Sequence, residues 1–267
     1  MPRKIFFAWQ LDSPSEHNKK FIWDALLHAT ENASTKGHPE LSPRPESDTQ
    51  GVPGTPNIVH TIFKRIQECA VFVADLSFIG TTLKGKKLPN PNVLIELGYA
   101  ARSIGWERTI LVMNSGLGPA MELPFDILQH RWPIEYRLTA QTQVRDRRFE
   151  ALSDALSAAL DDCEQYTLTR AAEMAAALDT ACLDFVAHNE TTSFIDMLFP
   201  EQTVGKLLLG LEQNLVVRRL IDLGALTVLT EPDIGYGWTY DGYRMIVEVN
   251  RADPMLLEVF RQHKTPK

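Results

Sequence analysis

The chain has 267 residues, a hydrophobic content of 44% and a formal net charge of -7, with an isoelectric point near 5.5. This length corresponds to one large domain or two modest ones, and the apolar content is sufficient for a buried core, so disorder is not expected. The negative charge argues against a protein that coats nucleic acid through bulk electrostatics.

Cysteine usage and the N-terminus bear on the compartment. Cys69, Cys163 and Cys182 lie far apart and form no Cys-x-x-Cys pair, so we predict three buried thiols and neither a disulfide framework nor a metal site. The apolar segment after the N-terminus is too short for a signal peptide, and no run approaches the roughly 20 apolar residues of a membrane span. We therefore expect a cytoplasmic protein with no membrane partner.

Short apolar runs alternate with helical patterns in the first half of the chain. Continuous apolar runs are typical of strands buried on both faces of a parallel sheet, while apolar residues at spacings of three and four indicate helices. A polar loop with three lysines is predicted between 75 and 93. The predicted strands are 4–9, 40–48, 70–74, 109–113 and 131–136, and the predicted helices are 18–37, 56–66 and 93–104. Because Pro43 and Pro45 cannot donate to a sheet ladder, the second strand is expected at an edge.

This alternation predicts an α/β unit with a five-stranded parallel sheet and helices on both faces. In such sheets the ligand lies beyond the carboxyl ends of the strands. Polar residues follow four of the predicted strands, and as a set they indicate a binding crevice. For any one of them, a simple turn or cap role remains an alternative. These residues are Gln10, Asp12, Asp48, Asp75 and Asn114.

The second half of the chain has a different residue pattern, in which helical spacing dominates. Alanine- and leucine-rich patterns predict helices from about 149 to 188, and an amphipathic helical pattern occupies 201–223. Two apolar runs, 224–230 and the run from Trp238, flank a turn-rich segment and predict a β-hairpin packed on helices. We therefore divide the chain into a domain at 1–139, a helical connector at 140–200 and a mainly helical module with a β-hairpin at 201–267.

Several motifs of the first half occur together in known proteins. They are Phe7-Ala-Trp-Gln-Leu-Asp12, Asp48-Thr-Gln-Gly-Val-Pro-Gly-Thr-Pro56, Val73-Ala-Asp75, Asn90-Pro-Asn-Val-Leu-Ile-Glu-Leu-Gly-Tyr-Ala100, Gly105-Trp-Glu-Arg108 and Leu123-Pro-Phe-Asp126. With this set, residues 3–137 resemble bacterial TIR-like domains, which share a flavodoxin-like fold with nucleoside 2-deoxyribosyltransferases. The resemblance implies a flavodoxin-like sheet and activity at an N-glycosidic bond, with Glu96 as the key carboxylate.

The residues suit that chemistry. Cleavage of a ribosyl C–N bond passes through an oxocarbenium-like transition state, which a carboxylate near the anomeric carbon stabilises or attacks. Glu96 lies among apolar neighbours in the sequence, so a charge at this position needs a reason; a solvated helix residue is the alternative. Nicotinamide leaves NAD as a neutral base and needs no general acid, whereas a purine leaves poorly without protonation.

The remaining candidate residues would surround the substrate. Gly51, Gly54 and Thr55 precede a helix N-terminus that offers N–H groups to a pyrophosphate, although the pattern matches neither the Rossmann nor the P-loop fingerprint. Asn92 is a candidate cap of the Glu96 helix, and Asn90 a candidate ribose contact. The candidates for base contacts are Trp9, which could instead finish the core, and Phe125 with Asp126, which could instead close the last crossover.

Two features qualify the resemblance. The segment 78–89 is basic and lacks the serine and tryptophan-cysteine signature of familiar TIR enzymes, which affects substrate identity. The segment from Leu220 through Trp238 to Arg244 is similar to the end of a winged-helix domain. DNA-reading versions carry a basic helix and wing, whereas charges nearly balance from 201 to 267, so contact with DNA has weak support and a regulatory protein or a second copy is favoured.

Three functions follow from these features. The first is an NAD hydrolase, with NAD as substrate and no cofactor, which by resemblance serves as an effector of bacterial anti-phage immunity that assembles when triggered. The second is a nucleoside 2-deoxyribosyltransferase-like or nucleoside-hydrolysing N-glycosidase, which needs an added acid, for which Asp12 and Asp75 are the candidates. The third is a nucleotide-sensing module without enzymatic activity.

Overall fold

The chain forms two compact units. The structure is a computed structural model that describes residues 4–34, 44–46, 58–142, 145–191, 195–196, 215–229 and 235–262. Contacts divide the chain into Pro2–Glu164 and Gln165–Lys267. The division falls inside the segment 140–200 that the sequence marks as a helical connector. A single helix, α5 (Arg145–Ala176), contains the division point.

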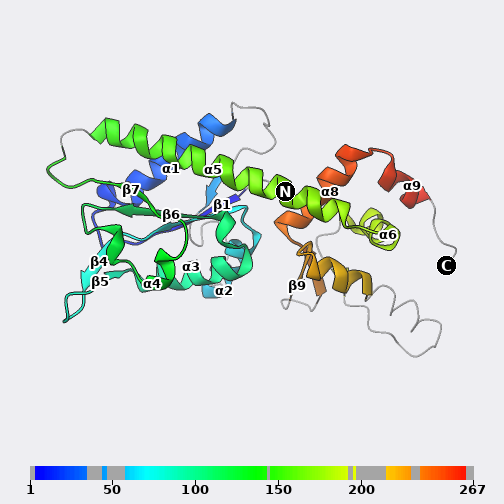
Figure 1. Cartoon of the computed structure of the whole chain (residues 1–267), viewed down its shortest axis with the longest axis horizontal. Helices are drawn as coiled ribbons and strands as arrows, with labels where there is room; N and C mark the ends of the chain where they lie inside the picture. The colour runs from blue at the N-terminus through cyan, green and yellow to red at the C-terminus, as the bar shows by residue number, and fades with distance from the viewer. Residues whose placement is uncertain are drawn as a thin grey trace. The chain divides into compact units, whose positions relative to one another are not determined.

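The N-terminal unit is built on a parallel sheet (Figure 1). Its strands follow the order β2-β1-β3-β6-β7, and every neighbouring pair is parallel. An α/β unit with a parallel sheet is therefore confirmed. Its strands are β1 (Lys4–Ala8), β2 (Arg44–Glu46), β3 (Val71–Asp75), β6 (Thr109–Asn114) and β7 (Ile134–Tyr136).

Helices cover both faces of this sheet, with α2 and α3 on one side and α1 and α5 on the other (Figure 1). Side chains of a strand alternate between faces, which separates two sets of core residues. Phe6 and Ala8 pack with residues of α2 and α3, whereas Phe7 contacts Trp23 of α1. The helices are α1 (Lys19–Ser34), α2 (Ile58–Glu68), α3 (Pro91–Ser103), the short α4 (Phe125–Leu128) and α5.

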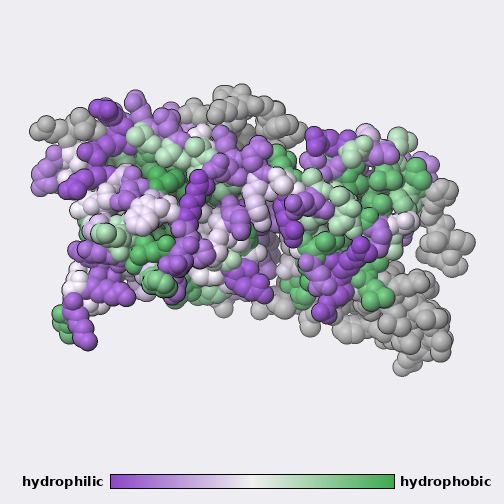
Figure 2. Space-filling model, in the orientation of Figure 1, coloured by the Kyte–Doolittle hydropathy of each residue, from purple (hydrophilic) through white to green (hydrophobic). Residues whose placement is uncertain are grey.

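The prediction of a lysine-rich loop between 75 and 93 is wrong, because this segment contains an antiparallel hairpin. Its strands are β4 (Phe78–Thr81) and β5 (Lys87–Pro89). Phe78 is buried and anchors the base, while Gly85, with a φ of 82°, supplies the left-handed turn residue. The hairpin projects from the unit with a largely hydrophilic surface (Figure 2), and Leu83 between its strands is fully exposed.

The predicted edge strand is present in shortened form. The segment 40–48 contributes β2, which lies at one edge of the sheet with β7 at the other. Gly37 and the loop at 51–57 lie outside the described residues.

The C-terminal unit combines helices with a small sheet of order β8-β10-β9. Its core contains Met174, Cys182 and Trp238 among others. A helix at 215–222 precedes β9, and the hairpin of β9 and β10 is antiparallel. The elements with printed bounds are α6 (Thr180–Asn189), β8 (Ile195–Asp196), β9 (Leu226–Leu229), β10 (Gly235–Trp238), α8 (Tyr240–Ala252) and α9 (Leu256–Gln262).

The second strand of the C-terminal hairpin was predicted to continue past Trp238. This prediction is wrong, because β10 ends at Trp238. The Thr239 side chain accepts the N–H of Gly242 at 3.0 Å and so caps helix α8, which takes up the apolar run. A Cβ at position 242 would lie 2.1 Å from the Ala225 carbonyl oxygen, so only glycine fits there. The hairpin is consequently followed by two helices.

All three cysteines are buried thiols, as predicted. Among the helices of the described residues, none combines the length and apolar character required to cross a bilayer.

Candidate functional site

The candidate carboxylate Glu96 lies in the second turn of α3. The helix begins at Pro91, whose fixed φ suits this position, and Asn90 precedes it. The Asn90 side-chain oxygen accepts the N–H groups of Asn92 and Val93 at 2.8 and 3.3 Å. Asn90 is thus the cap, and the prediction that Asn92 caps this helix is wrong; Asn92 is exposed.

Glu96 is half-buried beside the face by which α3 packs on the sheet. Val93, Leu97 and Ala100 form that buried face. On a helix, residue 96 lies at the flank of this face, between the buried side of α3 and its solvent-facing side.

Asp12 and Asn90 join two loops that are 78 positions apart in the sequence. The Asn90 Nδ2 donates to Asp12 Oδ2 at 2.7 Å. Asp12 follows the carboxyl end of β1, and Asn90 begins the helix that carries Glu96. Because Asn90 holds the backbone of α3 with its oxygen and Asp12 with its nitrogen, one side chain fixes both segments.

Trp9, directly after β1, is half-buried and holds a cation. The Lys19 ammonium lies 3.1 Å from the centroid of the Trp9 ring. Such a contact is attractive because the ring face carries negative charge. Since Lys19 occupies one face of the indole, only the other face could stack on a base.

Asp75 is the centre of a buried polar network at the carboxyl ends of the strands. Its carboxylate accepts the N–H of Ser77 at 3.0 Å and the Nδ2 of Asn18 at 3.3 Å, and all three residues are fully buried. Gln10 is 2% exposed and accepts the N–H of Ser13 at 2.9 Å. The predicted residues Gln10 and Asp75 therefore lie inside the protein in this structure.

Asn114 ties the network to the last strand. Its Nδ2 donates to the carbonyl oxygens of Leu138 and His17 at 2.8 and 3.3 Å. Its Oδ1 accepts the N–H groups of Gly116 and Leu138, both at 3.0 Å. Asn114 is also fully buried, so it holds loops together and has no surface with which to contact a ligand in this structure.

Burial changes the acidity of two members of this network. Burial raises the pKa of the Asp75 carboxyl, and hydrogen bonds from Ser77 and Asn18 oppose that rise. Burial, and then the nearby charge of Asp75, raise the pKa of Tyr136 well above its usual value. The Tyr136 hydroxyl, which donates to the carbonyl of His17 at 2.8 Å, therefore stays protonated.

The remaining residues predicted to contact the substrate do not belong to this buried network. Phe125 is 72% exposed and Asp126 is exposed, both on the short α4. Asp48, Gly51, Gly54 and Thr55 lie outside the described residues.

Three members of the network were not among the predicted site residues: Asn18, Ser77 and Tyr136. Each is a polar residue at an element boundary, since Asn18 precedes α1, Ser77 follows β3 and Tyr136 ends β7. The same signal identified Asp75 and Asn114, and applying it to every element boundary would have found them.

A cavity lies at the opposite end of the sheet. It has a volume of about 240 Å³ and is lined by the first residues of β6 and β7. None of the predicted site residues lines it. Within the part of the chain that the structure describes, no group of three or more His, Cys, Asp or Glu side chains is placed to hold a metal ion.

The comparisons with protein-family models and with curated proteins find no match.

Proposed function

We propose that the N-terminal unit cleaves the nicotinamide–ribose bond of NAD, with Glu96 as the carboxylate that faces the ribose. The observation that carries this proposal is the double role of Asn90, which caps the Glu96 helix and donates to Asp12 at 2.7 Å. These contacts bring the Asn90 amide and the Asp12 carboxylate together beyond the carboxyl end of β1, at the start of the helix that carries Glu96. Ligands of parallel α/β units bind at that end of the sheet.

The chemistry requires little more than this grouping. As the C–N bond lengthens, positive charge develops on the ribose, and the half-buried Glu96 would stabilise it more than an exposed carboxylate because fewer water molecules screen the charge. Nicotinamide departs as a neutral base, so its departure needs no proton. A water molecule then bonds to the ribose carbon and releases a proton to solvent, which gives ADP-ribose. Asp12 and Asn90 would accept from and donate to the ribose hydroxyls.

A deoxyribosyltransferase-like reaction has less support. It needs an acid that reaches the departing base, and the two candidates are engaged elsewhere. Asp75 is fully buried with Ser77 and Asn18, and Asp12 accepts from Asn90. A sensing module without turnover is the other alternative, and the experiment below separates all three.

The architecture supports the proposal. We propose a flavodoxin-like arrangement, because the order β2-β1-β3-β6-β7 is the order 2-1-3-4-5 of that fold when the five strands are numbered along the chain. The helix at 215–222 followed by the β9–β10 hairpin is consistent with a winged-helix-like module, although α8 and α9 extend beyond that pattern.

This module is proposed to bind protein, either a regulator or a second copy. Two arginines on the helix before the hairpin are paired with acids: Arg218 with Asp222 at 3.5 Å, and Arg219 with Asp179. A DNA-reading helix would present such arginines to phosphates and base edges. Pairing with carboxylates lowers the positive charge available for that purpose.

The test incubates the purified full-length chain with NAD and, separately, with pairs of deoxynucleosides and free bases. We expect nicotinamide and ADP-ribose from NAD, and a loss of at least about a thousandfold in Glu96→Gln, because the variant cannot offset the developing charge. Glu150→Gln, a change at an exposed glutamate of α5, is the matched control and should remain active.

Each alternative has its own outcome. Base exchange between deoxynucleosides that requires Glu96 would establish the transferase. NAD binding measured by calorimetry without product in any variant would establish the sensing module. An effector role in anti-phage immunity predicts that induced expression in bacteria lowers cellular NAD and arrests growth, and that Glu96→Gln does neither.

A further inference from the structure

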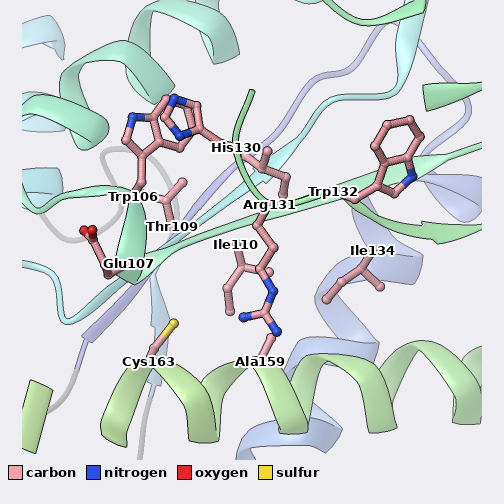
Figure 3. A pocket seen from close by; sticks show the side chains of 11 residues that line it. Trp106, Glu107, Thr109, Ile110, His130, Arg131, Trp132, Ile134, Ala159 and Cys163 are labelled. Atoms are coloured by element: carbon pink, nitrogen blue, oxygen red, sulfur yellow. The ribbon is translucent and has the colours of Figure 1, made fainter. Parts of the chain in front are cut away.

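The cavity at the amino ends of β6 and β7 has the character of a second ligand site (Figure 3). It lies at the opposite end of the strands from Glu96, and it involves none of the residues of the proposed function. Volumes of about 300–1,000 Å³ are usual for drug-sized ligands. A cavity of about 240 Å³ therefore suits a molecule of one or two rings.

Aromatic side chains form the upper walls. The rings of Trp106 and His130 stack with centroids 3.7 Å apart and an interplanar angle of 15°. Trp132, across the cavity in Figure 3, is 53% exposed, and its Nε1 donates to Glu135 at 2.8 Å. Flat, rigid ring walls favour a planar guest, because stacking requires no ordering of flexible side chains.

The floor is apolar and well ordered by the sheet and by α5. Ile110 comes from β6, and Ala159 and Cys163 come from α5; all three are buried. Transfer of a ring face from water to such a floor is favourable because apolar surface is removed from water. The floor therefore adds affinity without selecting for a particular polar group.

Three charged side chains, one cationic and two anionic, set the polarity of the guest. Arg131 extends over the cavity and pairs with Asp162 of α5 at 2.7 Å, and both side chains are well exposed. Glu107 also lines the cavity. With one cation and two carboxylates around the opening, an anionic guest would be repelled by Glu107 and Asp162, and a cationic guest would be repelled by Arg131. A neutral guest that accepts from the guanidinium and donates to a carboxylate avoids both conflicts.

We propose that this cavity binds a neutral planar heteroaromatic molecule of nucleobase size that carries both a hydrogen-bond acceptor and a donor. The guest lies between the Trp106–His130 stack and Trp132, with its polar edge at Arg131 and Glu107. An exposed ion pair such as Arg131–Asp162 is screened by water, so rearranging it to admit the guest costs little.

The test measures direct binding to the full chain by calorimetry and by ligand-observed NMR. Adenine and benzamide are the neutral probes, and benzoate and benzamidine are isosteres of benzamide with negative and positive charge. We expect saturable binding of adenine and benzamide, and at least tenfold weaker binding of the two charged isosteres.

A pair of variants locates the binding. Ala159→Leu places a larger side chain in the cavity and should weaken adenine binding at least tenfold. Ala158→Leu makes the same change at the neighbouring, exposed position of α5 and should leave it unchanged. Thermal unfolding of both variants establishes that each is folded, and Arg131→Met gives a second test that adds no bulk and should weaken adenine binding severalfold.

The outcomes are separable from those for Glu96. The proposal is overturned if neither neutral probe saturates at millimolar concentration, if Ala159→Leu binds adenine as tightly as the parent chain does, or if benzoate or benzamidine binds more tightly than benzamide. Loss of NAD cleavage in Glu96→Gln with retained adenine binding would support both sites independently.

Discussion

The two ends of the parallel sheet are built from different kinds of side chain. At the carboxyl ends of the strands, Asp75 and Asn114 are fully buried. Each accepts a hydrogen bond from a backbone N–H of the loop that follows its strand, Ser77 for Asp75 and Gly116 for Asn114. At the amino ends of β6 and β7, aromatic and apolar residues surround a cavity of about 240 Å³. Hydrogen bonds between buried polar groups fill the carboxyl end, whereas the amino end has an open space between aromatic rings.

This difference indicates how each end would meet a ligand. A buried hydrogen-bond network tolerates little change, because each donor or acceptor that loses its partner costs about 1–3 kcal/mol. The cavity tolerates added volume at its apolar floor, because Ile110 and Ala159 present no side-chain hydrogen bonds that would be broken there. If both proposals hold, the carboxyl end would be a fixed platform beside Glu96 and Asp12, and the amino end an adaptable recess.

The largest expected effect is the loss of the Asn114 side chain from the network. Asn114→Leu removes the partners of Leu138, Gly116 and His17 and leaves buried polar groups unsatisfied. We expect a decrease of at least about 3 kcal/mol in the free energy of unfolding, measured with urea. Asn92→Leu, at an exposed position of α3, should change it by less than about 0.5 kcal/mol. Equal effects would show that the network does not hold this end.

The second effect depends on pH. Because the folded pKa of Asp75 is raised, the unfolded chain loses the carboxyl proton at a lower pH than the folded chain does. The stability that Asp75 contributes is therefore complete below about pH 4, the ordinary carboxyl pKa, and is lost as the pH rises through the folded pKa.

Asp75→Asn removes this dependence. The free energy of unfolding of the variant, relative to the parent chain, should rise with pH by up to about 1.4 kcal/mol per unit within that window. Urea unfolding of both proteins across the range measures it. Parallel curves for the two proteins would contradict the assignment of Asp75 as a buried carboxyl with a raised pKa.

The third effect tests the double role of Asn90. Asn90→Ala removes the α3 cap and should lower the free energy of unfolding by about 1 kcal/mol. Asn90→Ser retains a capping oxygen but cannot reach Asp12, so stability should be nearly retained. If the proposed function is right, NAD cleavage should fall in both variants. Full activity in Asn90→Ser would show that the contact with Asp12 has no part in catalysis.

The smallest effect is expected at the amino end. Ala159→Leu places extra carbons in the cavity, so the melting temperature and the free energy of unfolding should change little, by less than about 1 kcal/mol. The same change at Ala25 of α1, which is fully buried and closely packed, should cost about 1–3 kcal/mol. A large loss of stability in Ala159→Leu would mean that the cavity closes in solution.

The parallel sheet could be predicted because its strands are short, continuous apolar runs bounded by polar residues. Lys4–Ala8 and Val71–Asp75 lie within one residue of the predicted strands at each end. The hairpin of β4 and β5 was not predicted, because only Phe78 and Pro89 at its base are buried and its strands show no continuous apolar run. The helix α8 was mistaken for a strand because Thr239 was not recognised as a cap. Met245, Ile246 and Val249 show the helical spacing that indicates it.

The candidate site was predicted in part. Strand-end polarity identified Asp75 and Asn114, and their closeness follows from adjacent parallel strands. Their complete burial does not follow from local sequence, because it depends on Asn18 and Tyr136, which come from distant segments. The cavity at the amino end could not be anticipated either, because it combines the turn at Trp106 with residues 130–134 and one side of α5.

The buried side chains at the carboxyl end should also slow the opening of the loops that they hold. The backbone N–H groups of Ser77, Gly116 and Leu138 each donate to a buried side chain, although none of them belongs to a strand. Amide hydrogens in such positions should exchange with deuterium as slowly as those of the strands, whereas loop amides usually exchange fast. A ligand that arrives here would meet loops whose conformational entropy was lost on folding, and its affinity would not be reduced by having to order them.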